Sequence, residues 1–85
     1  MEDSPKIVYP CQWTYAILAE EQGEPALRKQ IENIIAGRKH TLTFSKRSPK
    51  GNYISLHLEV YVRDQEERDL VFRSLKRAPG VKVVI

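Results

Sequence analysis

The sequence predicts an α+β fold in which two helices cover one face of a four-stranded antiparallel sheet. Stretches typical of β-strands occur four times along the chain. Two stretches with apolar residues at helical spacing separate them, so that the elements follow the order β-α-β-β-α-β. The chain has 85 residues, of which 41% are hydrophobic, which is enough for one small domain with a modest core.

The first strand is predicted at residues 11–19, where apolar and polar residues alternate. The segment EEQGEP interrupts this alternation. Gly23 permits a turn there, and Pro25 suits the first turn of a helix. The helix that follows is expected to end at Gly37, and its apolar stripe comprises Leu27, Ile31, Ile34 and Ile35.

A hairpin is predicted from two alternating strands, at residues 40–47 and 53–62, with the segment SPKG between them. A type I turn favours Ser at its first position, Pro at its second and Gly at its fourth, and Ser48, Pro49 and Gly51 match these preferences. A phosphate-binding loop would instead lead into a helix, and no helix follows Gly51. We therefore interpret SPKG as a chain reversal.

The second helix is predicted to begin after Asp64, which has the spacing of a capping box with Glu67. It ends at Pro79 and Gly80, and its apolar stripe comprises Val71, Phe72 and Leu75. A short last strand, VKVVI, completes the chain. The handedness of strand–helix–strand connections then favours a ferredoxin-like βαββαβ sandwich.

The alternation divides the strands between a core face and an uncovered face of the sheet. The predicted core comprises Trp13, Tyr15, Ile17, Leu27, Ile31, Ile34, Leu42, Phe44, Ile54, Leu56, Leu58, Val60, Val71, Leu75, Val81 and Val83. The uncovered face is expected to carry Thr14, Ala16, Leu18, Thr41, Thr43, Ser45, Tyr53, Ser55, His57, Glu59 and Tyr61.

The net charge of +3 is only a mild excess of basic over acidic residues. The basic residues are concentrated, however, in the hairpin region, because residues 38–50 contain five Lys and Arg residues and no Asp or Glu. An RNA-recognition module would place aromatic residues at positions that are here Asn52, Ile54 and His57. The sequence therefore does not match that module at these positions. An RNA-associated protein that uses the basic hairpin remains the alternative interpretation, and steep salt dependence of binding would identify it.

No motif in the sequence pairs a nucleophile with a base, so we do not expect an enzyme. The single cysteine, Cys11, can neither form a disulfide within the chain nor build a zinc site alone, and neither a metal nor a cofactor is expected. Residues 1–10 are predicted to be a polar leader before a domain at residues 11–85. With no signal peptide and no membrane-spanning run, a cytoplasmic location is expected.

A partner surface is the remaining candidate site. An uncovered sheet face with aromatic residues often binds a partner. A homodimer could form through this face or through the last strand, at an edge of the sheet. The candidate residues of this surface, taken from the hairpin and from the uncovered face, are Lys46, Arg47, Lys50, Tyr53, His57 and Tyr61.

The segments YPCQWTYAIL, SPKGNYISLHLEVYV and VKVVI resemble those of the YbeD-like proteins, which are small bacterial proteins of unknown function. The resemblance extends from Ile7 to Ile85. It implies a fold similar to ACT regulatory domains, which bind small effectors near the loop after the first strand. In this chain Gly23 and Glu24 lie in that loop. We therefore expect a non-enzymatic regulatory or adaptor module that binds a small metabolite or a protein partner.

Overall fold

The computed structural model describes residues 8–85 and confirms the predicted order of elements. The sheet contains β1 (Cys11–Glu20), β2 (His40–Arg47), β3 (Tyr53–Val62) and β4 (Val81–Val84). All neighbouring strands are antiparallel, in the order β2-β3-β1-β4. A short 3-10 helix, η1 (Glu21–Gly23), leads into α1 (Glu24–Ile35), and α2 (Gln65–Arg77) connects β3 to β4. Most of the predicted polar leader, residues 1–7, lies outside the described residues.

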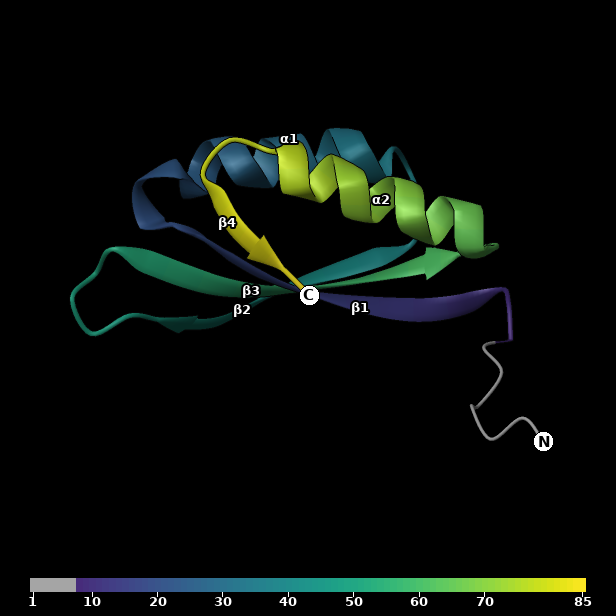
Figure 1. The fold of residues 1–85 in the computed structure, drawn as a ribbon, viewed down its shortest axis with the longest axis horizontal. Coiled ribbons are helices and arrows are strands. Elements are labelled where there is room, and N and C mark those ends of the chain that lie inside the picture. The colour runs from purple at the N-terminus through teal and green to yellow at the C-terminus, as the bar shows by residue number, and fades with distance from the viewer. Residues whose placement is uncertain (1–7) are drawn as a thin grey trace.

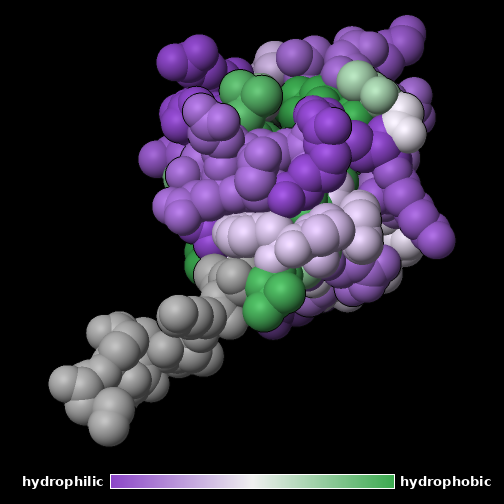
Figure 2. Space-filling view, turned by 90° about the vertical axis from the view of Figure 1, so that its right-hand side faces the viewer, coloured by the Kyte–Doolittle hydropathy of each residue, from purple (hydrophilic) through white to green (hydrophobic). Residues whose placement is uncertain are grey.

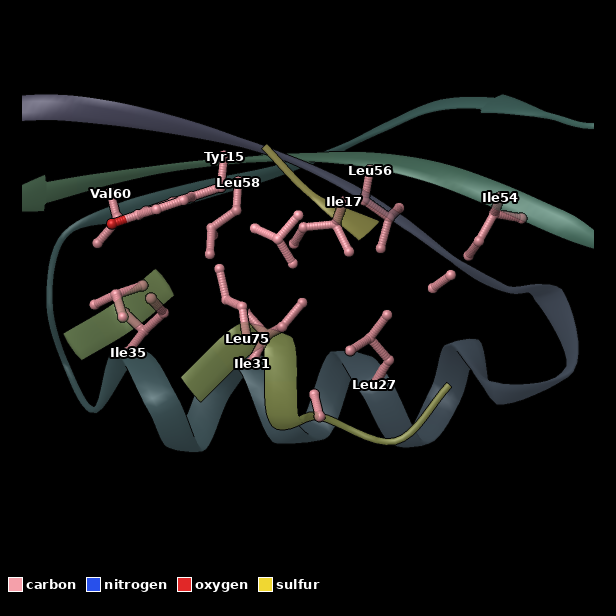
Figure 3. Packing of buried hydrophobic residues seen from close by; sticks show 14 of the residues in the cluster. Tyr15, Ile17, Leu27, Ile31, Ile35, Ile54, Leu56, Leu58, Val60 and Leu75 are labelled. Carbon is pink, nitrogen blue, oxygen red and sulfur yellow. The ribbon is translucent and has the colours of Figure 1, made fainter. Parts of the chain in front are cut away.

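Both helices lie on the same face of the sheet, and the other face has no covering layer from residues 8–85 (Figure 1). The core fills the space between the sheet and the helices (Figure 3). It is formed by inward-facing residues of β1 and β3 together with the apolar stripes of α1 and α2, and its fully buried large side chains are Tyr15, Ile17, Leu27, Ile31, Ile35, Ile54, Leu56, Leu58, Leu75, Val60, Val62 and Val71.

The prediction that Phe44 belongs to the core is wrong, because Phe44 is 41% exposed to solvent. Phe44 pairs with Leu56 and therefore lies on the helical side of the sheet. However, β2 is the outermost strand on its side of the sheet, so that Phe44 has a neighbouring strand on one side only. The guanidinium carbon of Arg47 lies 5.5 Å from the centre of the Phe44 ring and covers part of it.

The prediction that Val83 belongs to the core is also wrong, and a β-bulge explains why. Ala19 pairs with Val81, whereas Leu18 pairs with Val83, so Lys82 is an extra residue in β4. The extra residue turns Val83 to the uncovered face, where it is 44% exposed, and turns Val84 into the core. The prediction assumed a regular alternation, which would place Val83 in the core and Val84 on the uncovered face.

The turn assigned to SPKG is confirmed. The N–H of Gly51 donates to the carbonyl oxygen of Ser48 at 2.9 Å, which closes the four-residue turn. The Oγ of Ser48 also accepts from the N–H groups of Asn52 and Tyr53. Gly51 has φ = +72°, a conformation that residues with a side chain rarely adopt. The loop therefore uses its serine and glycine to reverse the chain.

Candidate functional site

The uncovered face of the sheet places two kinds of side chain in different regions. At its centre, His57 of β3 lies between Ala16 of β1 and Thr43 of β2, and Glu59 lies between Thr14 and Thr41. These small and polar neighbours leave the centre of the face open to water. Apolar side chains gather instead toward β4.

We call this second region the apolar patch, and it comprises Ala16, Leu18, Val83 and Ile85. Leu18 pairs with Val83, and Ala16 and Ile85 exchange backbone hydrogen bonds of 3.1 and 2.9 Å. A shallow cavity of about 170 Å³ lies here, with the apolar patch and Ser55 in its lining. Leu18 is 38% exposed and Ile85 is 80% exposed, so the patch is accessible.

The sequence-predicted partner residues do not form one surface. Tyr53, His57 and Tyr61 lie along the same face of β3, and Lys46 joins them there because it pairs with Ser55. Arg47 lies on the opposite, helical face of the sheet. The bulge between Phe44 and Lys46 shifts the register by one residue, so that Arg47 pairs with the buried residue Ile54. Lys50 lies in the turn at the tip of the hairpin.

Arg47 reaches across to the loop after β1, where its Nε lies 3.0 Å from Oε1 of Glu21. The N–H of Glu21 also donates to the carbonyl oxygen of Asn52 at 3.0 Å. These two contacts connect the tip of the hairpin to the segment between β1 and α1, which we call the β1–α1 junction (residues 20–24). The charge of Arg47 is therefore engaged within the molecule, although half of its side chain remains exposed.

Gly23 and Glu24, the predicted ligand residues, lie at this β1–α1 junction. Gly23 is the N-cap of α1 with φ = −91°, and Glu24 forms a 2.8 Å ion pair with Arg28 one turn later. Glu20 forms a 3.2 Å ion pair with Lys82. A nearby cavity of about 270 Å³ is lined by Glu20, Gln22, Gly51, Asn52 and Tyr53. The carboxylates of the junction thus already have cationic partners.

A second polar junction, which sequence reasoning missed, joins the end of α1 to the start of α2. The side chain of Glu67 is buried and accepts hydrogen bonds from the backbone N–H of Arg63 at 2.7 Å and from Nε of Arg38 at 2.9 Å. Asp64 caps α2 by accepting from the N–H of Glu67 at 2.8 Å, as the capping-box spacing predicts. That spacing was the one sequence signal that singled out Glu67.

The charged state of Glu67 is favoured at this junction. The backbone N–H of Arg63 holds the pKa of Glu67 below its ordinary value of 4.5; burial opposes this, and Arg38 adds to it. A cavity of about 360 Å³ next to the ion pair is lined by Ala36, Arg38, Lys39, Tyr61, Arg63 and Glu67. Figure 2 shows that the end of the molecule where α2 begins is mainly hydrophilic, with hydrophobic residues in small separate patches.

A third feature lies where α2 crosses β1. The Tyr15 hydroxyl donates to the carbonyl oxygen of Arg68 at 2.6 Å, and the guanidinium carbon of Arg68 lies 4.6 Å from the centre of the Trp13 ring. Burial raises the pKa of Tyr15 to about 12. The two aromatic residues and Arg68 line a largely apolar cavity of about 260 Å³ with Asp69, Phe72 and Ile85.

Neither a metal centre nor a membrane helix is found in the described part of the chain. Within residues 8–85, no three side chains of His, Cys, Asp or Glu are grouped so that they could hold a metal ion. No helix in the same range is long and apolar enough to cross a membrane.

The family of the chain follows from its similarity to known proteins in sequence and structure. A family model described as "Protein of unknown function (DUF493)" matches residues 4–85. The uncharacterised protein Cj0253 of Campylobacter jejuni is 30% identical over 76 residues, which cover 89% of this chain and 85% of that protein. The solution structure of HP0495 from Helicobacter pylori has a TM-score of 0.82 and 23% identity, covering 96% of this chain and 88% of that one.

The fold is also similar to that of an ACT domain. The ACT domain of GTP pyrophosphokinase from Chlorobium tepidum has a TM-score of 0.62 and 18% identity, covering 87% of this chain and 94% of that domain. At this identity the likeness concerns the fold alone. The ACT-like fold and the YbeD-like resemblance expected from the sequence are thus confirmed, and the match over residues 4–85 shows that the chain belongs to the DUF493 family.

Proposed function

We propose that the protein is a non-enzymatic regulatory or adaptor module that binds a protein partner on the uncovered face of its sheet. The observation that carries this proposal is the distribution of exposed hydrophobic residues. Among residues 8–85, eight large hydrophobic residues are exposed, and five of them lie on this one face: Leu18, Tyr53, Tyr61, Val83 and Ile85. Three of them, Leu18, Val83 and Ile85, are contiguous in the apolar patch. Exposed hydrophobic residues with a polar surround are typical of protein-binding surfaces.

The charges on the uncovered face support a protein rather than a nucleic acid. Glu59 and Glu20 lie on the same face as Lys46, so the face has no field of a single sign. In the hairpin, Arg47 is paired with Glu21. A surface that binds phosphates needs several unpaired cations together, and this arrangement offers fewer than the sequence predicts.

Site-specific photocrosslinking in cells tests the proposal. A photoreactive phenylalanine analogue at Tyr53 should crosslink to one discrete protein, and the same analogue at Arg73, on the exposed surface of α2, should not. Leu18→Lys should abolish the crosslink from Tyr53. Leu70→Lys is the matched control, because Leu70 is 50% exposed on α2 and belongs to the other side of the molecule.

Other results would overturn the proposal in distinguishable ways. Crosslinks from Arg73 but not from Tyr53 would place the partner on the helices. Amide NMR shifts confined to Gly23 and Glu24 on addition of pooled amino acids and central metabolites would indicate an effector-binding domain. Binding to RNA that falls steeply with salt would favour the basic hairpin.

A further inference from the structure

The N-terminal half of β1 lacks a strand partner on the side of β4. β4 is short, and its contacts with β1 extend from Glu20 to Ala16, where Ile85 forms the last backbone hydrogen bonds. β1 itself continues to Cys11 and pairs throughout with β3 on its other side. We call residues 11–15 of β1, on the side where β4 stops, the free edge; no strand within residues 8–85 pairs with it.

The free edge presents a defined set of hydrogen-bonding groups. Along a strand, the N–H and C=O of alternate residues point to the same side. The N–H groups of Ala16 and Glu20 both donate toward the β4 side, to Ile85 and Gly80 respectively. The N–H and C=O groups of Gln12 and Thr14 therefore point outward to the same side, while those of Trp13 pair with β3. Two residues thus offer two donors and two acceptors.

A cavity lies beside these groups on the helical side of the sheet. It is the cavity of about 260 Å³ between Trp13, Tyr15, Phe72 and Ile85, with Arg68 stacked on Trp13. The hydroxyl of Tyr15 donates a 2.6 Å hydrogen bond to the carbonyl oxygen of Arg68, which connects β1 to α2 at this cavity. A strand added along the free edge would point the side chain opposite Trp13 toward this side.

The outer edge of β2 has no comparable feature, although it is also unpaired within the described chain. A bulge at Ser45 interrupts it, and Lys46 and Arg47 lie along it. Bulges and lysines are features with which proteins prevent pairing at a sheet edge. The free edge of β1 has a regular register and no Lys or Arg from Cys11 to Tyr15.

We propose that the free edge of β1 binds an extended segment of a partner protein, which adds to the sheet as an antiparallel strand in line with β4. Its backbone pairs with Gln12 and Thr14, and an apolar side chain opposite Trp13 enters the cavity. Arg68 lies beside Asp69, with Nε 3.5 Å from Oδ1, so these two charges offset each other, and the largely apolar remainder of the lining favours aliphatic side chains. This mode of recognition combines backbone affinity with side-chain specificity at alternate positions.

The probe for this site is the peptide acetyl-Val-Thr-Val-Thr-Val-amide, whose first two valines occupy the positions opposite Trp13 and Cys11 and whose acetyl carbonyl faces the N–H of Thr14, clear of Ile85. Titrated into the ¹⁵N-labelled full-length protein, it should shift the amides of Gln12 and Thr14 and the indole N–H of Trp13. The same peptide with both threonines N-methylated lacks the donors and should give no shifts.

Thr14→Pro removes one outward N–H and should weaken binding by about tenfold, because one backbone hydrogen bond is lost and the ring also obstructs the edge. Proline is tolerated at such a position because this N–H does not serve the β1–β3 pairing. Thr14→Ala, the matched control, keeps the N–H and should bind within about twofold of the wild type.

Three outcomes would overturn the proposal: no shifts at Gln12 and Thr14 up to millimolar peptide, equal shifts with the N-methylated peptide, or concentration-dependent shifts at these amides without peptide. The last would identify a second copy of this chain as the occupant. The inference does not depend on the proposed function. Leu18→Lys should leave peptide binding intact, and Thr14→Pro should leave the crosslink from Tyr53 intact, so each can fail alone.

Discussion

Arg38 links the end of α1 to the buried carboxylate of Glu67 at the start of α2. Its Nη2 lies 2.8 Å from Oε2 of Glu67, and its Nη1 donates to the carbonyl oxygens of Ile34 and Ile35 at 3.2 and 3.0 Å. The last carbonyl groups of a helix have no partners within the helix. One guanidinium therefore completes the end of α1 and neutralises the carboxylate that α2 buries.

Arg38→Ala should lower the free energy of unfolding by about 2 kcal/mol. The substitution removes the nearer cation of the buried Glu67 carboxylate, so that only Nη2 of Arg63, at 3.5 Å, remains. It also removes the side-chain hydrogen bonds to the last carbonyls of α1, and the partial exposure of Arg38 moderates the loss. Urea unfolding followed by circular dichroism measures it. Arg28→Ala, which removes the more exposed ion pair with Glu24, should cost less than about 0.5 kcal/mol. Equal losses for the two variants would contradict this role of Arg38.

The stability should fall in acid partly because of Glu67. Its pKa is lowered in the folded state, so below the ordinary value of 4.5 the unfolded chain binds more protons, and the free energy of unfolding decreases as pH falls through the folded pKa. The difference in stability between wild type and Glu67→Gln should therefore shrink from pH 7 toward the acid limit. Urea titrations at a series of pH values test this, and a constant difference would disprove it.

Tyr15 should make the stability sensitive to alkali. Because its pKa is raised to about 12, its contribution is complete below the ordinary value of 10 and is lost as pH rises from 10 to 12. Tyr15→Phe removes the hydrogen bond to Arg68 and should cost about 1 kcal/mol at neutral pH. Tyr61→Phe, at a residue that is 42% exposed, is the control and should be close to neutral. Thermal unfolding at each pH, with tyrosinate absorbance, measures both effects.

Gly51→Val should destabilise the protein by about 1–2 kcal/mol, because φ = +72° is unfavourable for a β-branched residue. Differential scanning calorimetry should show a midpoint that is lower by roughly 4–8 °C for each kcal/mol. Lys50→Ala, at the exposed neighbouring position of the same turn, should leave the midpoint unchanged. If Gly51→Val had the same unfolding midpoint as the wild type, the assigned turn conformation would be incorrect.

The fold could be predicted from the sequence because alternation and helical spacing are local patterns, and β3 follows its pattern without interruption. Phe44 and Val83 were misplaced because each lies beside a bulge or at an edge, and neither leaves a mark in the alternation. The Arg38–Glu67 pair was missed because its members are 29 residues apart. Arg38 was grouped with a basic segment by sequence, whereas the fold pairs it with an acid.

The bulge at Lys82 also decides how far β4 reaches. In a regular ladder from Val81, Val83 would lie opposite Ile17, and Ile85 would lie opposite Tyr15 instead of Ala16. Either register places a valine opposite Ile17, so hydrophobic burial alone discriminates weakly between them. In the bulged register Lys82 reaches Glu20. A slip of one residue would therefore let the chain's own terminal strand compete for part of the edge that a partner segment would use.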